Sequence, residues 1–356
     1  MSNTFGKNFR VTTAGESHGG AIAAIVDGCP AGLKISKKDL QIELDRRKVG
    51  QSKITTQRRE TDEIQIMSGV SQEGVTLGTP ILLVSYNKDA KSDDYEHLKD
   101  LYRPSHADYT YEAKYGIREW RGGGRSSARE TLSRVAAGAI AQIYLRQKGK
   151  IEFLSFVEQV GNVVLEKKDF AKITRKKIEA NIVRCPNEKK AKEMISLIEQ
   201  VQKEKDSVGG VVCGLIRNVP AGLGEPVFAK LEADLASAMM SIGATKGFEI
   251  GRGFASAEMR GSTHNDEFLI QNKKIRTQTN NAGGILGGIS NGEDIYFRVA
   301  FKPTATIGKR QKTVTRDKKQ VNLEASGRHD PCVVPRAVAI VDAMAALVVM
   351  DHYLGR

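Results

Sequence analysis

The sequence has few cysteines, few aromatic residues and no long apolar run. The four cysteines among 356 residues form no CxxC pair, which argues against a disulfide framework or a metal cluster and favours a reducing compartment. They are Cys29, Cys185, Cys213 and Cys332. The longest uninterrupted apolar stretch is residues 343–350, and residues 1–20 contain no apolar block. Neither a membrane-spanning helix nor a secretory signal is expected, so we expect a cytoplasmic protein that contacts no membrane.

Acidic residues are also in short supply. The 55 Lys and Arg residues outnumber the 42 Asp and Glu residues, which leaves a net charge of +13. An excess of this size indicates polyanionic partners, either nucleic acid or small ligands with several negative charges. A single tryptophan and 6% aromatic residues weigh against a stacking surface for single-stranded nucleic acid.

Strand-like and helical patterns together predict an α+β fold. Segments rich in β-branched residues predict strands over 8–13, 21–26, 80–85, 151–160, 210–217 and 294–302. One helix is expected to begin at Ser36, because Asp39 stands at the capping-box position, and a second at Ser127, with Glu130 in the same relative place.

Two further helices are expected nearer the C-terminus. One has Pro226 in its first turn, buries Val227, Leu231 and the apolar residues that follow, and stops at Gly243. The other, over residues 335–353, is apolar nearly all round and is predicted to be central and buried.

Two internal repeats suggest a duplicated architecture. Residues 25–33 are similar to 215–223, and both contain Pro-Ala-Gly-Leu between a strand and a helix. Likewise, Gly-Arg at 124–125 precedes Arg-Val-Ala at 134–136, and Gly-Arg at 327–328 precedes Arg-Ala-Val at 336–338. We expect one domain over residues 1–356, with related halves of about 1–150 and 205–356 joined by 151–204. Chance similarity of short strings of Ala, Gly and Pro is the alternative.

The segment 121–130, Arg-Gly-Gly-Gly-Arg-Ser-Ser-Ala-Arg-Glu, has the composition of an anion site. Glycines let the backbone approach a ligand, a helix N-terminus follows, and Arg125, Arg129 and two serines add charge and hydroxyl donors. A tight turn before an ordinary N-cap is the alternative. The Gly-rich segment 282–288 carries a weaker signal of the same kind, and neither common nucleotide fingerprint occurs.

Three of the six histidines lie in polar turns suited to acid–base work: His18, His106 and His329. A structural role is the alternative for each, and the remaining histidines are taken as structural. No HxH or HxxxH spacing indicates a metal site, and no GxSxG elbow indicates a hydrolase. Two basic loops, 46–59 and 307–320, are compatible with anion binding, with nucleic-acid binding or with solvated surface.

Five motifs in the same order resemble those of the chorismate synthase family. They lie at 15–19, 103–111, 122–138, 302–304 and 327–332, and the likeness runs from Phe9 to about His352. The resemblance implies a lyase that converts 5-enolpyruvylshikimate 3-phosphate to chorismate and phosphate by an anti 1,4-elimination that requires reduced FMN, the last step of the shikimate pathway. It also implies a β-α-β sandwich with central helices between two antiparallel sheets, a homotetramer, and no nucleic-acid partner.

The same resemblance implies roles for individual residues. His18 would assist phosphate departure, His106 would place positive charge beside the flavin, and Asp330 would assist proton removal. The implied FMN contacts are Arg125, Ser126, Ser127, Gly243, Ala244, Gly287, Lys302, Pro303, Thr304, Ala305, Thr306 and Arg328. The implied substrate or NADP contacts are Arg47, Lys53, Arg129 and Arg336.

Some positions depart from the family pattern. Lys53 stands where Arg is common and loses the bidentate fork, Gly243 replaces Asn or Gln, and the pair Ala305-Thr306 replaces two serines. These departures bear on flavin affinity. No extra reductase segment stands out, which favours an external source of reduced flavin. The rival hypotheses are a nucleic-acid-binding protein and a flavin-dependent reductase.

Overall fold

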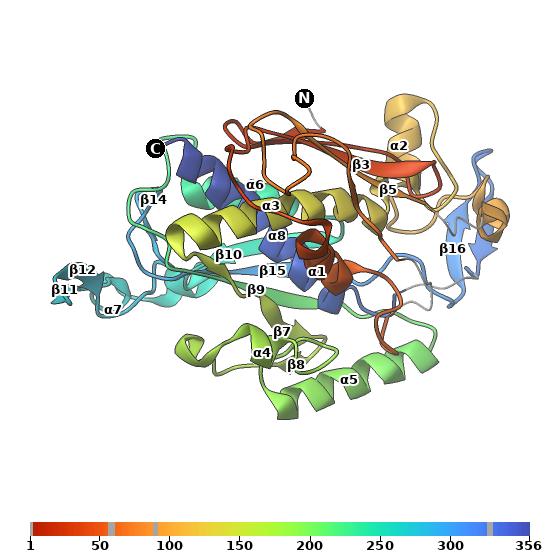
Figure 1. Ribbon diagram of the computed structural model, residues 1–356. Coiled ribbons are helices and arrows are strands. Elements are labelled where there is room, and N and C mark those ends of the chain that lie inside the picture. Colours follow the sequence, from red (N-terminus) through yellow and green to blue (C-terminus); the bar gives the residue numbers. More distant parts are fainter. Residues whose placement is uncertain (1–2, 56–60, 88–91, 326–329) are drawn as a thin grey trace.

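Two antiparallel sheets dominate the fold. A computed structural model describes residues 3–55, 61–87, 92–325 and 330–356 (Figure 1). The strands of the first sheet are β1 (Thr4–Phe5), β2 (Arg10–Ala14), β3 (Ala21–Asp27), β4 (Gln65–Ile66) and β5 (Ile81–Tyr86). Their order in the sheet is β1-β2-β3-β5-β4.

The second sheet has six strands. They are β6 (Glu152–Phe153), β7 (Phe156–Val160), β8 (Val163–Val164), β9 (Gly210–Arg217), β10 (Thr245–Ile250) and β15 (Ile295–Phe301). Their order is β10-β15-β9-β7-β8, with β6 also paired to β9. Small hairpins are formed by β11 (Phe268–Gln271) with β12 (Lys274–Thr277), β13 (Ile285–Leu286) with β14 (Ile289–Ser290), and β16 (Gln311–Val314) with β17 (Gln320–Leu323).

Helices pack against both sheets. The α-helices are α1 (Lys37–Arg47), α2 (Asp108–Tyr115), α3 (Thr131–Gly149), α4 (Arg175–Ile178), α5 (Glu188–Lys203), α6 (Leu231–Met240), α7 (Gly261–His264) and α8 (Val334–Leu354). The 3₁₀ helices are η1 (Ser92–Leu98), η2 (Gly124–Ser126), η3 (Ala128–Glu130), η4 (Phe170–Lys172) and η5 (Gly253–Glu258). Helix α3 packs on β2, β3 and β5, α8 packs on β7 and β9, and the two helices pack on each other (Figure 1).

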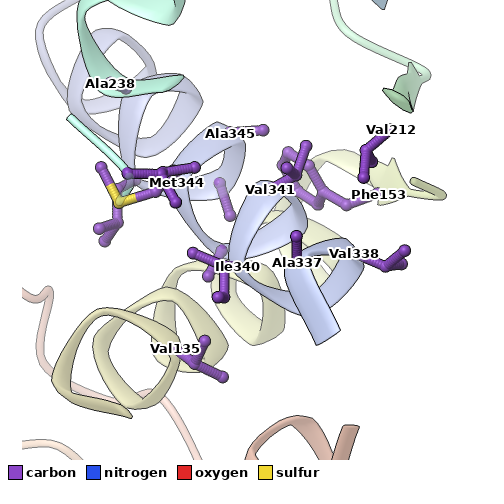
Figure 2. Close-up of a cluster of buried hydrophobic side chains, with 14 of the residues drawn as sticks. Val135, Phe153, Val212, Ala238, Ala337, Val338, Ile340, Val341, Met344 and Ala345 are labelled. Atoms are coloured by element: carbon purple, nitrogen blue, oxygen red, sulfur yellow. The ribbon is translucent and has the colours of Figure 1, made fainter. Parts of the chain in front are cut away.

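Helix α8 is the centre of the core. Residues 334–350 are all buried, and α8 side chains meet Val135 of α3, Ala238 of α6, Phe153 of β6 and Val212 of β9 (Figure 2). By length and composition alone this helix could cross a membrane, but it is a core helix surrounded by other elements of the same chain. Its all-round apolar surface is therefore explained by burial on every side.

Most of the predicted elements are confirmed. The predicted strands match β2, β3, β5, β9 and β15 closely, whereas the segment 151–160 is divided into β6 and β7. Ser36 caps α1 through the expected capping box with Asp39. The four cysteines are free and buried, in agreement with the expected lack of disulfides.

Two expectations about helix starts are wrong. Helix α6 begins at Leu231, and Val227 is 69% exposed because residues 225–229 first form a turn closed by the Glu225–Ala229 bridge. Ser127 does cap η3, but the Glu130 carboxylate accepts from the Arg134 guanidinium instead of completing a capping box.

The repeated Pro-Ala-Gly-Leu segments adopt the same turn. After β3, the N–H groups of Gly32 and Leu33 donate to the carbonyl and the hydroxyl of Thr76. After β9, the N–H groups of Gly222 and Leu223 donate in the same way to Ser290. The Thr76 hydroxyl donates to the carbonyl of Pro30, and the Ser290 hydroxyl donates to that of Pro220.

Candidate active site

A cavity of about 730 Å³ lies where α3 and α8 begin, and we call it the central cavity. Further walls come from the segment 103–107, the glycine loop before α3, the segment 241–244 after α6 and the segment 301–306 after β15. Residues far apart in the sequence meet here because α3 and α8 cross in the core. The volume falls within the range of about 300–1,000 Å³ that is usual for small-molecule and cofactor sites.

The lining is strongly cationic. Seven basic residues contribute to it, namely Arg47, Arg103, Arg125, Arg129, Arg134, Lys302 and Arg336. Among the described lining residues the acids are Glu130 and Asp330. Such a lining favours a ligand that carries several negative charges.

The glycine loop brings two of the predicted histidines together. Gly122, Gly123 and Gly124 all have positive φ angles, which L side chains rarely adopt. A Cβ atom at Gly122 would come closer than 3.0 Å to the ring of His18, and one at Gly123 would meet Cε1 of His106 at 3.0 Å. Glycine is therefore required for both rings to pack on this loop.

His18 lies just behind the cavity wall. Its Nδ1 is 3.1 Å from Oγ of Ser17, which lines the cavity, and its ring packs edge-on against Tyr95 with 5.1 Å between centroids. The Ser17 hydroxyl is thus a link between the imidazole and the cavity.

His106 is held by a buried ionic cluster. Its Nδ1 is 2.9 Å from Oδ1 of Asp108, and that carboxylate also accepts two bonds of 2.7 Å from the guanidinium of Arg103. Burial lowers the pKa of His106 below its ordinary value, although its hydrogen bond with Asp108 opposes that change. His106 lines the cavity, as expected from the sequence.

Arg47 and Arg129 share one counterion that the sequence did not reveal. The Asp62 carboxylate accepts from Arg47 through Oδ2 and from Arg129 through Oδ1, both at 2.7 Å. Arg47 also donates to the carbonyl groups of Ala128 and Arg129, at 3.2 Å and 3.3 Å. Arg47 thereby ties the end of α1 to the start of α3.

Asp330 and Arg336 form an ion pair at the opposite wall. The Arg336 guanidinium donates to Oδ2 of Asp330 and, at 3.0 Å, to the carbonyl oxygen of Arg47. The Thr304 hydroxyl donates to the Asp330 carbonyl at 2.5 Å. Asp330 therefore connects two parts of the lining, the segment after β15 and the start of α8.

The predicted flavin segment around Arg125 is held by hydrogen bonds within the chain. Arg125 donates to Oγ1 of Thr13 at 2.7 Å, and the Ser126 hydroxyl donates to the carbonyl of Gly123 at 2.7 Å. The Ser127 hydroxyl accepts from the backbone N–H of Arg129. All three predicted residues line the cavity.

The two segments after α6 and β15 face this loop. They supply Gly243, Ala244, Lys302, Pro303, Thr304, Ala305 and Thr306 to the lining, as expected. Lys302 Nζ donates to the Ser105 carbonyl at 2.6 Å, and burial, together with nearby Lys246, lowers its pKa. A Cβ atom at Gly243 would have no neighbour within 4 Å, so this position is open.

Two of the predicted contacts, Lys53 and Gly287, are not among the lining residues of this cavity. Lys53 is exposed and pairs with Glu199 at 2.5 Å. Gly287 lies in the turn between β13 and β14 and is not among the lining residues. Arg328 and His329 lie outside the described residues.

Sequence reasoning missed the acids that support the basic lining. Asp62 is isolated in the sequence from both arginines that it joins. Asp108 and Arg103 lie in the motif at 103–111, where the spacing His106-x-Asp108 could have indicated the contact between the imidazole and the carboxylate. Neither acid was singled out.

The chain is similar to known proteins over nearly its whole length. A family model described as Chorismate synthase matches residues 9–354. Proteins named Chorismate synthase from Crocosphaera subtropica and Synechocystis sp. are each 59% identical to it, over 99% of this chain and 97% and 98% of those proteins. A solved structure described as "Crystal Structure of Chorismate Synthase" has a TM-score of 0.79 and 33% identity, over 99% of this chain and 93% of that chain.

Proposed function

The chain belongs to the chorismate synthase family, and we propose that the central cavity is where the family's reaction takes place. The enzyme is a lyase acting on phosphates, and its reaction converts 5-enolpyruvylshikimate 3-phosphate to chorismate and phosphate. The observation that carries the placement is that a lining with seven basic residues includes the glycine loop on which His18 and His106 both pack.

The charges of the substrate account for the basic lining. One phosphate and two carboxylates enter together, and a cavity that accepts them needs converging cations. Arg129 and Arg336 lie on walls formed by the starts of α3 and α8, and we assign the carboxylates or phosphate to them. Arg47 acts by holding the start of α3, since its guanidinium already contacts Asp62 and two backbone carbonyls.

Family members use reduced flavin, and the residues that line the cavity fit FMN. Ser126, Ser127 and Arg125 at the glycine loop provide hydroxyl and cationic groups for a phosphate, and Lys302, Thr304 and Thr306 add more from the facing wall. Ile242, Ala244, Phe301, Pro303 and Val333 give that wall an apolar surface against which a flat ring can lie. When bound, reduced FMN would lend electron density transiently to the substrate and recover it.

The elimination requires one proton donor and one proton acceptor. Phosphate departure breaks a C–O bond and leaves negative charge on the phosphate, and we assign the neutralisation of this charge to His18, acting through the hydroxyl of Ser17. We assign assistance in removing the ring proton to the Asp330 carboxylate on the opposite wall, which Arg336 holds by an ion pair.

Larger-scale features of the proposal follow from the fold. The packing of α3 on the first sheet and α8 on the second supports a β-α-β sandwich, and the matched turns at Thr76 and Ser290 support two related halves in one domain. We further propose a cytoplasmic homotetramer with no nucleic-acid or membrane partner. The flavin or substrate contacts of Lys53, Gly287 and Arg328, and any use of NADP, remain predictions.

An anaerobic assay tests the proposed function. Purified protein is mixed with 5-enolpyruvylshikimate 3-phosphate and chemically reduced FMN, and the release of phosphate and chorismate is followed, with oxidised FMN as the matched control. We expect equal amounts of the two products with reduced FMN and none with oxidised FMN. Absence of product from folded protein would contradict the proposal, and steeply salt-dependent binding to duplex DNA would then favour the nucleic-acid alternative.

A further inference from the structure

Asp108 stands at the first position of α2 and is almost completely buried. It accepts from Arg103 through the backbone N–H at 3.1 Å and through Nε and a terminal nitrogen at 2.7 Å each. Arg118, also buried, lies 2.9 Å from Oδ1. Two guanidinium groups and a helix N-terminus thus surround one carboxylate.

This surrounding charge keeps Asp108 ionised. The hydrogen bonds from Arg103 and His106 outweigh the effect of burial and hold the pKa of Asp108 far below its ordinary value. An ionised carboxylate can only accept hydrogen bonds, so Nδ1 of His106, 2.9 Å away, must be the donor in that pair.

The other edge of the His106 ring faces the glycine loop. Cε1 and Nε2 lie 3.0 Å and 3.3 Å from the place where a Cβ atom of Gly123 would be, and the ring lines the central cavity. With its proton on Nδ1, a neutral imidazole has its lone pair on Nε2.

We propose that Asp108 is a positioning residue, which fixes the proton of His106 on Nδ1 and so turns Nε2, the nitrogen that can take up or release a proton, towards the central cavity. The proposal rests on the proposed function only in taking that cavity as the reaction site. The cationic His106 that the family resemblance implies would carry its second proton on this Nε2.

The charged groups near the ring support a neutral imidazole. Asp108 favours a charged ring, whereas burial and the positive charges of Arg103 and Arg118 disfavour it, and the net result is a lowered pKa for His106. Behind Arg118, Glu112 lies 3.3 Å from its Nε and 2.8 Å from Nε of Arg316. On the other side, Lys302 donates to the carbonyl of Ser105, next to the ring.

Nuclear magnetic resonance of the full-length, ligand-free protein tests the placement of the proton. The chain is labelled with ¹⁵N-histidine, and the His106 signals are assigned by their loss in the His106→Asn variant. At pH 7.5 we expect a neutral ring with the proton on Nδ1. A proton on Nε2, or a doubly protonated ring, would overturn the proposal whether or not the protein makes chorismate.

The variants Asp108→Asn and Glu112→Gln distinguish a positioning effect of Asp108 on His106 from a general loss of protein stability. Both remove a carboxylate that touches Arg118, but only Asp108 contacts His106. For Asp108→Asn we expect a lower NMR titration midpoint for His106 and a fall in kcat of at least about tenfold, with KM for the substrate within about threefold. Glu112→Gln should leave all three nearly unchanged.

Equal effects of the two variants, or an unmoved His106 titration in Asp108→Asn, would refute the positioning role. If Asp108→Asn does not fold, because Arg103 and Arg118 lose the carboxylate that they share, the tautomer measured in the wild-type chain decides the question alone.

Discussion

At the residue scale, the glycine loop is the most tightly constrained part of the site. The Gly122→Ala variant would push a methyl group into the ring of His18, in addition to the strain of a φ angle of +62°. We expect turnover in the anaerobic assay to fall at least about tenfold, because small displacements of a reacting group are costly.

Gly116→Ala is the matched control for that substitution. Its φ angle is +73°, but a Cβ atom there would have no neighbour within 4 Å. The strain of about 1–2 kcal/mol should therefore be similar in the two variants, whereas turnover should stay near normal in Gly116→Ala. Equal turnover in both variants would show that packing of His18 on the loop does not matter.

A second residue-scale prediction concerns Asp62, which is fully enclosed between Arg47 and Arg129. Asp62→Asn removes the buried carboxylate that joins two guanidinium groups and should lower the free energy of unfolding by about 3 kcal/mol. Asp45→Asn removes a half-exposed pair with Lys48 and should change that free energy by less than about 1 kcal/mol. Urea unfolding compares the two, and similar losses would contradict the special role of Asp62.

A third prediction follows from the lowered pKa of His106. In the unfolded chain this group has an ordinary pKa near 6.5, so below that pH the unfolded state binds a proton that the folded state resists. Stability contributed by the neutral ring is therefore present above pH 6.5 and is lost as the pH falls towards the lowered folded value, by at most about 1.4 kcal/mol per pH unit.

The measurement is urea unfolding of the wild type and of His106→Asn at pH 7.5 and pH 5.5. Other titrating groups contribute to both proteins and largely cancel in the difference. The wild type should lose more stability than the variant on acidification. A difference that does not change with pH, or changes in the opposite direction, would contradict the lowered pKa.

At the element scale, the contact between α3 and α8 positions both walls of the cavity. A Cβ atom at Gly138 would lie 2.5 Å from Cβ and 2.7 Å from Cα of Ala343, so Gly138→Ala must separate the helices. We expect a loss of about 1–3 kcal/mol in unfolding free energy, as is usual for overpacking.

Gly149→Ala, in the last turn of the same helix, is the control. A Cβ atom there would meet side-chain atoms and no backbone, at 3.1 Å or more, and alanine is the better helix former by about 1 kcal/mol. This variant should be at least as stable as the wild type. A Gly138→Ala protein as stable as Gly149→Ala would mean that the helices can separate without cost.

Local sequence signals predicted a helix or strand well where contacts between residues close in the sequence determine it. Alternating β-branched residues predicted β3, β9 and β15, and the Ser36–Asp39 pair predicted the start of α1 because the cap is made within one turn. The start of α6 could not be predicted, because Pro226 belongs to a turn closed by the pairing of Glu225 with Ala229.

The candidate site could be predicted only in part. Motifs identified the cationic groups and the glycine loop, since residue type and spacing carry that information. The pairing of Asp62 with Arg47 and Arg129 depends on how α1 and α3 pack, and no short motif records it. The orientation of His106 likewise depends on Asp108, Arg103 and Arg118 meeting in three dimensions.

At the scale of the whole molecule, the charge balance and the cavity belong together. The chain has a net charge of +13, and its central cavity is lined by seven basic residues. Four acids balance only part of this positive charge: Glu130 and Asp330 in the lining, and Asp62 and Asp108 behind it. A positive potential at the cavity mouth should therefore raise the encounter rate with an anionic substrate.

Added salt tests this electrostatic attraction. Raising NaCl from about 20 mM to about 200 mM shortens the screening length to below about 10 Å, so kcat/KM should fall by at least about threefold while kcat changes little. Sucrose at equal osmolality is the uncharged control and should leave kcat/KM unchanged. If kcat fell as much as kcat/KM, salt would be acting on the folded site itself. If neither moved, the buried acids would be neutralising the arginines that they hold, and the excess charge of the chain would have to serve some purpose other than capturing the substrate.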